Sequence, residues 1–569
     1  MAGWTSMIGL GMRGLLARRV ASLSDTRWWG RHAGMVQRRQ LLGLLRHAAG
    51  TEIGKGAGFE RLARLPEHEL VGAYKSATAA GDYEVFRARL ARMREQAAPD
   101  VLWPGVVRDW AQTSGTTGGN GQKYIPVSAE MMKSNRRAAF DIFAHAARFG
   151  CSLPGIYGGR LLFLGGSTDL ETNEHGVRTG DLSGVVTRLI RWPLTEVVAP
   201  SADIALMNHW PSKIDAMARQ VAGMDVRFIS GMASWSLVLF EKVIALAREK
   251  NPKVRTLRDV WPNFRLFCHG GVNYAPFDAR VREAWSGDVN IDVPTRVEVY
   301  PASEGFIAVQ DTAGDPGLRL HTDIGVFYEF VPLEEIDRFA ASGGAGGGAR
   351  SFTCDQVETG QRYVVVMSTC AGLWRYIIGD TVVFDTAGPT APPRLRIVGR
   401  HKAFINAFGE NLIVEDVETA VVEAARALRV SVGEFTASPV YPGPGRRAGI
   451  ELVAEWGGAD FGGGEPTGES AKLVEAFAQE FDQALRNRGV DYNIKRTGDL
   501  GMARAVVSAV PVGTFHAWMA SKGKLGGQHK APRCANNRTI VEELLATAGS
   551  RGSGVIASGA RMLERSGVG

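Results

Sequence analysis

A segment rich in glycine and hydroxyl side chains, TSGTTGGNGQK at residues 113–123, is the part of the chain best suited to binding an anion. Glycines let backbone N–H groups converge on anionic oxygens, and serine and threonine hydroxyls add donors. Lys123 supplies a positive charge at the end of the segment. The segment lacks the Gly-Lys-Ser/Thr ending of a Walker A loop. The interpretations are a flexible turn or a phosphate-binding loop whose donors are Ser114, Gly115, Thr116 and Thr117.

Three chemically different side chains come together in the segment EVYPASEG at residues 298–305, directly after a β-like run. The ring of Tyr300 could stack on a base, the hydroxyl of Ser303 could bond a phosphate oxygen, and the carboxylate of Glu304 could hold a magnesium ion. Two of the three have a structural alternative. Tyr300 could be an ordinary core aromatic, and Glu304 could pair with an arginine.

A carboxylate also ends the apolar run LWRYIIGD at residues 373–380. A buried aspartate without partners is costly, so Asp380 requires a hydrogen-bonding partner, and the two hydroxyl groups of a ribose would serve. In the structural alternative, Asp380 caps the turn before Thr381.

These candidate residues lie among alternating β-rich and helical segments, a pattern typical of the α/β class. Continuous apolar strands favour a sheet that is buried on both faces. A helix is expected at residues 128–148, where Ser128 can cap the first turn and apolar side chains recur on one side. The expected strands are at residues 160–165, 225–230, 264–271, 296–300, 325–331, 362–368 and 374–384.

The pattern restarts near residue 399 and predicts two domains. The first, at residues 1–398, is a large domain with mixed or parallel sheets that begins with a helical layer. The second, at residues 399–569, is a smaller α/β domain. Its expected elements are a helix at 414–428, a strand at 450–456, a helix from 469 and a strand at 503–510. Glycine-rich loops are expected at 342–348 and 457–464, and a disordered tail at 549–569.

Bulk composition excludes several classes of protein. The 569 residues, 45% hydrophobic and 22% charged, are ordinary for soluble protein and too many for one core. A net charge of +7 over this length predicts no nucleic-acid partner. Five scattered cysteines without a CxxC pair favour a reducing cytoplasm. Residues 1–20 favour an amphipathic helix over a signal peptide, no run predicts stable membrane insertion, and no protein partner is evident.

In this order and spacing the three segments resemble the adenylate-forming, firefly luciferase-like superfamily, and within it the auxin-responsive Gretchen Hagen family of acyl acid amido synthetases. The resemblance covers nearly the whole chain. The segments at 513–515 and 528–533 are similar to this family rather than to its acyl-CoA ligase relatives. The further segments are TEIGKGAGF at 51–59, RFISGMASW at 227–235, FRLFCHGG at 264–271, GTF at 513–515 and QHKAPR at 528–533.

The resemblance implies an ATP-dependent ligase with two half-reactions. A small carboxylic acid attacks the α-phosphorus of ATP and expels pyrophosphate, and an amine such as an amino acid then attacks the acyl-adenylate and expels AMP. Catalysis would rest on positioning and electrostatic stabilisation. The implied contacts are residues 114–117 and Lys123 with the phosphates, Tyr300 with adenine, Ser303 with the α-phosphate, Glu304 with Mg²⁺ and Asp380 with the ribose.

The resemblance also implies a hinge near residues 399–406, about which the smaller domain moves, with Arg400 near the ribose and phosphate. An exposed surface lysine is the structural alternative for each candidate catalytic lysine. Relatives often carry lysine or another charged residue where this chain has asparagine in Gly-Glu-Asn at 409–411, which weakens the lysine assignments. The candidate lysines are Lys530, for a mobile cation that reaches the adenylate, Lys402 and Lys123.

An apolar acyl pocket is expected between the helix after the phosphate loop and residues 228–235, lined by Phe140, Met232 and Trp235. Helical spacing alone would make these core residues.

An acyl-CoA ligase is the alternative enzyme and predicts a thiol acceptor. A third possibility is a non-catalytic binding protein on the same fold. The intact glycine-rich loop, Glu304 and Asp380 disfavour it. Scattered histidines and the absence of GxSxG exclude zinc and serine hydrolases.

Overall fold

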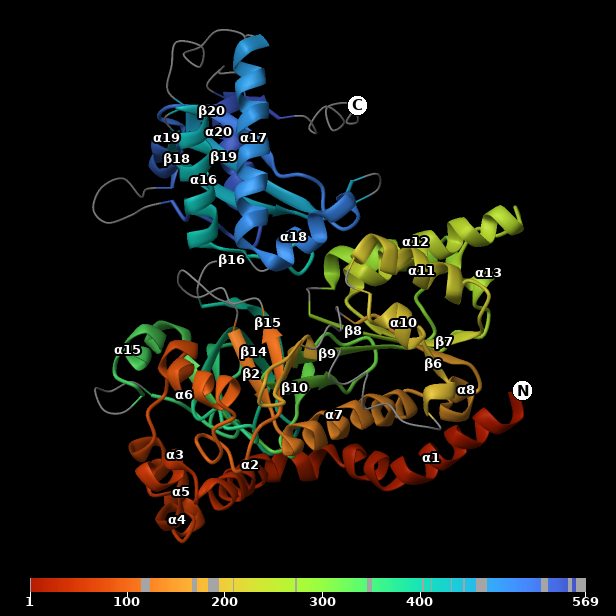
Figure 1. The fold of residues 1–569 in the computed structure, drawn as a ribbon, viewed down its shortest axis with the longest axis vertical. Coiled ribbons are helices and arrows are strands. Elements are labelled where there is room, and N and C mark those ends of the chain that lie inside the picture. Colours follow the sequence, from red (N-terminus) through yellow and green to blue (C-terminus); the bar gives the residue numbers. More distant parts are fainter. Residues whose placement is uncertain are drawn as a thin grey trace. The chain divides into compact units, whose positions relative to one another are not determined.

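A computed structural model of the chain describes two compact units (Figure 1). The larger contains Met1–Thr113, Gln122–Asn273 and Val281–His401, and the smaller contains Tyr274–Arg280 and Lys402–Gly569. The α/β class is confirmed, while the boundary after residue 398 and the hinge near 399–406 stay predictions. The described residues are all except 1, 114–122, 166–170, 183–193, 208, 272–273, 345–349, 402–403, 411, 431, 444–445, 457–467, 523–530, 551–554 and 559–569.

The larger unit is built on an eleven-stranded mixed sheet. In sheet order its strands are β12 (Val326–Pro332), β13 (Arg362–Thr369), β14 (Tyr376–Thr386), β15 (Arg394–Arg400), β11 (Leu318–Leu320), β10 (Gly305–Gln310), β9 (Arg296–Ala302), β8 (Leu266–Gly270), β7 (Val226–Gly231), β3 (Arg160–Phe163) and β6 (Val198–Ala199). Strands β6 to β9 in this order are parallel, and the pairs from β9 to β12 are antiparallel. All the strands expected from the sequence in this unit are present.

Helices precede and separate these strands along the chain. None of the described helices is both long and apolar enough to cross a membrane. The expected helix after Ser128 is present, and the Ser128 hydroxyl accepts a 2.9 Å hydrogen bond from the Met131 N–H. The helices up to residue 341 are α1 (Ala2–Ser24), α2 (Thr26–Ala48), α3 (Glu52–Ala57), α4 (Phe59–Leu62), α5 (Glu67–Ala77), α6 (Tyr83–Glu95), α7 (Ala129–Arg148), α8 (Leu153–Tyr157), α10 (Ala202–Ala205), α11 (Trp210–Val221), α12 (Ala233–Lys250), α13 (Leu257–Val260), α14 (Asp278–Ser286) and α15 (Ile336–Ala341).

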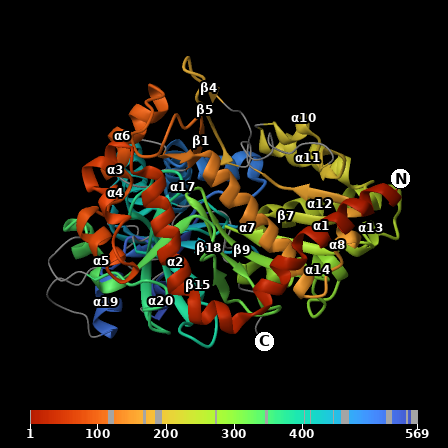
Figure 2. The same cartoon turned by 90° about the horizontal axis from the view of Figure 1, so that it is seen from below.

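Helices cover both faces of the parallel part of the sheet (Figures 1 and 2). On one face, the Phe143 ring of α7 lies 5.4 Å from the Phe228 ring of β7. The Phe240 ring of α12 lies 5.9 Å from the Phe267 ring of β8. Phe228 pairs with Leu266, so Phe267, one residue on, points to the opposite face. Helices α7 and α12 therefore lie on opposite faces of the sheet.

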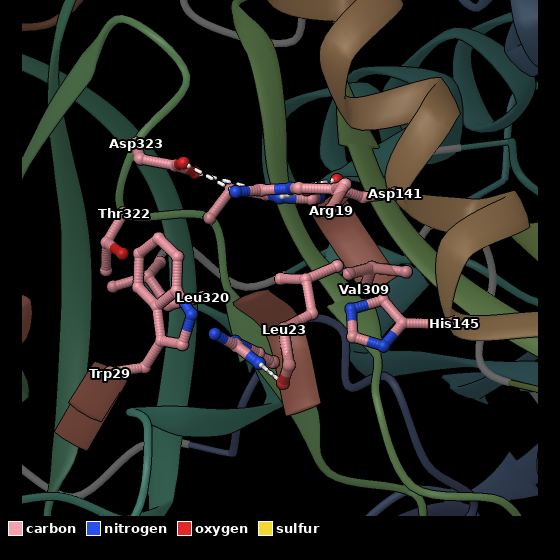
Figure 3. A pocket seen from close by; sticks show the side chains of 11 residues that line it. Arg19, Leu23, Trp29, Asp141, His145, Val309, Leu320, Thr322 and Asp323 are labelled. Atoms are coloured by element: carbon pink, nitrogen blue, oxygen red, sulfur yellow. Dashed lines mark hydrogen bonds and ion pairs between the residues drawn. The ribbon is translucent and has the colours of Figure 1, made fainter. Parts of the chain in front are cut away.

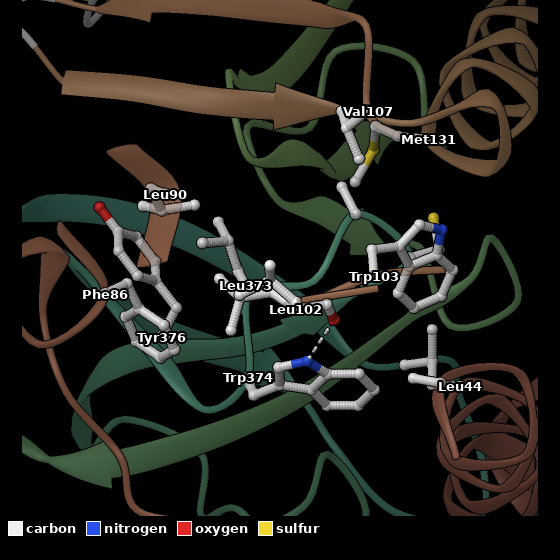
Figure 4. Close-up of a cluster of buried hydrophobic side chains, with 14 of the residues drawn as sticks. Leu44, Phe86, Leu90, Leu102, Trp103, Val107, Met131, Leu373, Trp374 and Tyr376 are labelled. Carbon is white, nitrogen blue, oxygen red and sulfur yellow. Dashed lines mark hydrogen bonds between the residues drawn. The ribbon is translucent and has the colours of Figure 1, made fainter. Parts of the chain in front are cut away.

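A hydrophobic core joins the N-terminal helices to the antiparallel strands (Figure 4). The buried Trp374 indole N–H donates a 3.0 Å hydrogen bond to the Leu102 carbonyl. The next residue, Arg375, has no exposed side-chain surface and forms two 3.0 Å hydrogen bonds with Glu329. Its guanidinium also donates to the Thr78 carbonyl at 2.9 Å. This satisfied buried ion pair ties the helical layer to the sheet.

A separate four-stranded sheet contains the strands on either side of residues 114–122. Strands β1 and β2 pair antiparallel, with Thr113 opposite Lys123. The glycine-rich segment therefore connects two strands that pair with each other. The order is β2 (Lys123–Val127), β1 (Asp109–Thr113), β5 (Arg178–Gly180) and β4 (Glu171–Thr172).

The smaller unit has its own sheet with helices on both faces. In β19, Val453 belongs to a core cluster with Leu544 of α20, whereas the Trp456 ring lies 5.1 Å from the Phe477 ring of α17. Positions 453 and 456 point to opposite faces of a strand. The elements expected at 414–428, 450–456, 469 and 503–510 are all present. The elements are β16 (Phe404–Ile405), β17 (Leu412–Ile413), α16 (Val414–Leu428), β18 (Val432–Val440), β19 (Gly449–Trp456), α17 (Gly468–Arg488), α18 (Val490–Arg496), β20 (Val506–Pro511), α19 (Thr514–Ser521), α20 (Thr539–Ser550) and β21 (Ile556–Ala557).

Candidate functional site

The parallel strands β7, β8 and β9 end at one edge of the sheet, and candidate residues follow directly. Met232 comes after β7, Gly271 after β8 and Ser303 after β9. Gly271 has a φ of +82°, and a Cβ there would lie 3.3 Å from the Met232 Cγ, so these two turns are adjacent. Open α/β sheets bind ligands outside the carboxyl ends of their strands. This edge is therefore the first place to look for a binding site.

Ser303 and Glu304 form the two-residue turn between β9 and β10. The strands pair Ala302 with Gly305, which leaves only these two residues in the connection. Ser303 is half-buried, and Glu304 is 9% exposed. The tight turn holds a hydroxyl and a carboxylate at the edge where the parallel strands end.

Tyr300, Asp380 and Arg400 form one hydrogen-bonded cluster. The Tyr300 hydroxyl donates to Asp380 Oδ2 at 2.5 Å, and Arg400 Nε donates to Asp380 Oδ1 at 2.8 Å. Asp380 and Arg400 are opposite each other on β14 and β15. Strands β15, β11 and β10 separate β14 from β9, so the contact with Tyr300 requires the sheet to curve back on itself.

Burial and the neighbouring carboxylate set the protonation states of this cluster. Burial, reinforced by Asp380, raises the pKa of Tyr300 far above its ordinary value, so the phenol stays a hydrogen-bond donor. Burial alone would lower the pKa of Arg400, but the Asp380 carboxylate outweighs it and raises that pKa. The Tyr300 ring is 4% exposed and packs in a core cluster, as its structural alternative described. Its role as an adenine-stacking surface stays a prediction.

The backbone next to Asp380 depends on a glycine. Gly379 has a φ of +93°, and a Cβ on it would lie 3.1 Å from His401 Cε1. The His401 backbone N–H donates to the Gly379 carbonyl at 3.0 Å. Asp380 lies within β14 rather than at a turn, and the buried Thr381 hydroxyl has no hydrogen-bond partner in the described part of the chain. Asp380 is therefore not the turn cap of the structural alternative.

Glu304 is a buried carboxylate that forms no ion pair with an arginine of the described residues. Burial raises its pKa, and the nearby positive charge of Lys123 acts in the opposite direction. The Tyr376 hydroxyl hydrogen-bonds the Glu304 carboxylate. Among the described residues, no arginine or lysine forms an ion pair with Glu304, while Arg400 pairs with Asp380. Glu304 thus keeps acceptor capacity for a further ligand.

Lys123 and Tyr376 link the glycine-rich hairpin and strand β14 to this site. Lys123 begins β2, and its ammonium group lies 5.9 Å from the centre of the Tyr83 ring. Neither Tyr83 nor Tyr376 was expected at the site from the sequence. The only signal for Tyr376 was its place four residues before Asp380 in one apolar run, because a register shift in β14 between Ile377 and Thr381 prevents alternation from relating their faces. Tyr83 offered no such signal, because only the packing of α6 brings it here.

The three residues expected to line the acyl pocket lie apart. Trp235 of α12 is 4% exposed and stacks on Trp210, with ring centroids 4.3 Å apart and an angle of 18° between the rings. Phe140 packs in the core on the face that α7 covers, opposite to α12. Only Met232 lies at the turn after β7, beside Gly271. The structure does not bring Phe140 together with Trp235, and the pocket assignment stays a prediction.

Several predicted site residues lie outside the described part of the chain. They belong to the glycine-rich loop and to the candidate lysines, so their roles also stay predictions. These residues are Ser114, Gly115, Thr116, Thr117, Lys402 and Lys530.

The donor set fits a magnesium ion that is held mainly by a nucleotide. Among the described residues, no group of three or more histidine, cysteine, aspartate or glutamate side chains is placed to hold a metal. Mg²⁺ in nucleotide sites takes one or two carboxylates and completes its shell with water and phosphate oxygens. Glu304, which has no ion-pair partner in the part of the chain that the structure describes, is a suitable single carboxylate.

Three family models match the chain in order: the GH3 family N-terminal domain at residues 29–200, the central domain at 320–400 and the C-terminal domain at 415–539. The chain belongs to the GH3 family. The resemblance stated from the sequence is thereby confirmed. The N-terminal match of this GH3 chain contains Lys123, and the central match contains Asp380 and Arg400.

Known relatives of this GH3 protein are plant amido synthetases. It is 27% identical over 317 residues to indole-3-acetic acid-amido synthetase GH3.8 of Oryza sativa subsp. indica. This match covers 53% of this chain and 49% of the relative. It is 28% identical over 356 residues to probable indole-3-acetic acid-amido synthetase GH3.9 of Oryza sativa subsp. japonica. This second match covers 60% of this chain and 74% of the relative. The match to the first therefore spans about half of that protein's length.

A solved structure shows the same fold. The structure titled AtGH3.15 acyl acid amido synthetase in complex with 2,4-DB matches with a TM-score of 0.51 and 17% sequence identity. The match covers 95% of this chain and 97% of that one. The likeness shows that the two chains share their overall fold.

Proposed function

We propose that this GH3 protein is an ATP-dependent acyl acid amido synthetase. It would convert a small carboxylic acid and ATP into an acyl-adenylate and pyrophosphate, and then transfer the acyl group to an amine such as an amino acid, releasing AMP. The observation that carries the proposal is the cluster of Tyr300, Asp380 and Arg400 near Glu304, at the edge where the parallel strands end. Family membership and the amido synthetase relatives support the same reaction class.

In this proposal the cluster binds the nucleoside and its first phosphate. Asp380 accepts hydrogen bonds from the ribose hydroxyls, and Arg400, which Asp380 orients, contacts the ribose and α-phosphate. Ser303 donates to an α-phosphate oxygen from the β9–β10 turn. Tyr300 holds Asp380 in place through its hydroxyl and would offer one ring edge or face to adenine.

Glu304 is the proposed protein ligand of Mg²⁺. A bound magnesium ion would neutralise charge on the phosphate oxygens as pyrophosphate leaves. Tyr376 orients the Glu304 carboxylate by its hydrogen bond, and Lys123 adds a positive charge nearby. The glycine-rich loop would surround the outer phosphates with the donors Ser114, Gly115, Thr116 and Thr117.

The acyl and amine partners would meet beyond the turn after β7. Met232 and Trp235 remain the proposed apolar contacts of the acid, and Lys530 and Lys402 the proposed mobile cations. Domain rotation about the hinge near 399–406 would exchange groups between the two half-reactions. A cytoplasmic location is also part of the proposal, supported by five cysteines that are all free thiols.

The identity of the acceptor separates the proposal from the acyl-CoA ligase alternative. We expect the enzyme, supplied with ATP, Mg²⁺ and a panel of carboxylic acids, to form acyl hydroxamate with hydroxylamine and an amide with a pool of amino acids. Mass spectrometry of the products identifies which acid and which amine react. Coenzyme A in a parallel reaction is the control acceptor.

Each outcome of this experiment has a definite meaning. An amide with equimolar AMP supports the amido synthetase. A thioester without any amide would retain adenylation and replace the proposed acceptor by a thiol. Hydroxamate formation from no acid in a broad panel would overturn the proposed activity.

A further inference from the structure

A small cavity lined by charged side chains lies within the larger unit, apart from the residues proposed to bind ATP (Figure 3). Its volume is about 10 Å³, the space of roughly one water molecule. Its walls come from the end of α1, the start of α2, one face of α7, strands β10 and β11, and the residues directly after β11. The lining residues that carry charge or can titrate are Arg19, Asp141, His145, Arg319, His321 and Asp323.

One of the two lining arginines is fully neutralised. Arg19 donates from Nε and Nη2 to Asp141 at 2.7 Å each, and from Nη1 to Asp323 at 2.8 Å. Arg137 also donates to Asp323, at 2.6 Å. Both lining carboxylates are therefore already engaged by guanidinium groups, as Figure 3 shows for Arg19.

The second lining arginine forms no ion pair with any carboxylate among the described residues. Arg319 is 4% exposed; its Nη1 donates to the Leu23 carbonyl at 3.0 Å, and its guanidinium lies 5.0 Å from the centre of the Trp29 ring. Within the described residues, Arg319 Nη2 has no hydrogen-bond partner, and no carboxylate forms an ion pair with this arginine. Asp311, the acidic group that most affects it, is paired with Arg394 at 2.9 Å. Burial lowers the pKa of Arg319 to about 10.

Two histidines complete the polar wall. His321 is 4% exposed, directs Nδ1 toward Asp141 at 3.4 Å, and leaves Nε2 without a partner in the described chain. His145 Nδ1 lies 2.7 Å from Arg148 Nη1. Arginine can only donate, so His145 Nδ1 accepts and Nε2 carries the proton. The cavity is thus bordered by the N–H donor Nε2 of His145 and by a buried arginine for which the described residues supply no ion-pair partner.

We propose that this cavity binds a single monatomic anion, chloride under ordinary ionic conditions. One negative charge next to Arg319 Nη2 would supply the ion-pair partner that the described residues do not, because an unpaired buried charge is strongly unfavourable. The volume excludes phosphate, sulfate and carboxylate ligands. A water molecule would fill the space but would leave the charge of Arg319 uncompensated.

The proposed ion has a structural consequence. Arg319 belongs to β11 and holds the carbonyl of Leu23, the residue before the end of α1, while its guanidinium lies over Trp29 of α2. An anion on Arg319 would therefore stabilise the attachment of the first two helices to the sheet. Binding to the folded state alone raises stability with ligand concentration.

Crystals of the full chain grown in sodium bromide test the site directly. We expect an anomalous peak from bromide in contact with Arg319 Nη2. Density that refines as water with no anomalous signal at high bromide concentration would overturn the proposal. This experiment uses the unmodified protein and does not depend on how a variant folds.

Thermal unfolding in solution supplies a second test. At constant ionic strength, we expect the midpoint to rise as chloride replaces gluconate, which is too large for the cavity. Arg319→Met should abolish this rise, and Arg137→Met, which removes an exposed arginine of the same network, should retain it. Equal midpoints in chloride and gluconate, or an unchanged chloride dependence in Arg319→Met, would contradict a chloride site.

Discussion

Glu304→Gln is expected to lower the rate of acid-dependent ATP–pyrophosphate exchange by about 10²–10³-fold, the usual effect of removing one electrostatic contact with a transition state. Glutamine keeps the shape of the side chain but supplies no charge to a magnesium ion. The remaining activity should require more Mg²⁺ than the parent enzyme does. Exchange measured across a range of Mg²⁺ concentrations separates weaker metal binding from a slower chemical step.

A loss of activity in Glu304→Gln cannot be attributed to unfolding. Burial raises the pKa of Glu304, so the folded protein is destabilised by its ionised form, and a neutral replacement should leave the unfolding midpoint equal or higher. Glu334→Gln, at an exposed position after β12, is the matched control and should exchange at the parent rate. Full exchange activity in Glu304→Gln would remove Glu304 from the proposed metal site.

Asp380→Asn is expected to lower kcat/KM for ATP by about 10²-fold, because hydrogen bonds to a charged group contribute about 1.5–3 kcal/mol each. The substitution removes the negative charge that orients Arg400 and that would accept the ribose hydroxyls. Much of the loss should fall on KM for ATP, since the ribose is remote from the reacting phosphorus. Steady-state kinetics with varied ATP at saturating acid measures both terms.

The same strand provides the control for Asp380. Asp385 lies on β14, five residues after Asp380, and its carboxylate pairs with the half-exposed Arg396. The substitution Asp385→Asn removes this carboxylate. It should leave KM for ATP unchanged, because exposed ion pairs contribute little and this one lies outside the proposed site. If Asp385→Asn and Asp380→Asn had equal effects, the loss would reflect a general disturbance of β14.

Elements with a strong local signal could be predicted from the sequence. The apolar runs that became β3, β7, β8, β9, β12, β13 and β14 were found, as was α7 with its Ser128 cap. Strand β15 was not expected, because its sequence RLRIVGR alternates arginine with apolar residues on a largely exposed strand. Strand β10 was missed for a different reason. The turn at residues 303–304 is flanked by Pro301 and Gly305, but the segment was interpreted as a ligand-binding motif rather than as a hairpin.

The candidate site could be predicted only in part, because its contacts join distant segments. The motif order placed Tyr300, Glu304 and Asp380 in one hypothesis, and the structure brings these residues together with Arg400. The role of Tyr376 as a partner of Glu304 depends on sheet curvature, which no local pattern encodes.

Side-chain direction across the sheet was equally inaccessible to sequence reasoning. Phe140 and Trp235 looked like two walls of one pocket, but their helices cover opposite faces of the sheet. The same limit applies to the anion cavity. Its arginines and histidines come from segments far apart in the chain, none of which forms a motif of its own.

Asp380 and Glu304 are proposed to bind one nucleotide, and a crystal structure of the chain with ATP and Mg²⁺ would show whether they do. The account predicts that the ribose hydroxyls donate to the Asp380 carboxylate, that Arg400 contacts the ribose or α-phosphate, and that the metal bridges Glu304 and the phosphates. Nucleotide density at a place where it touches neither carboxylate would contradict the account.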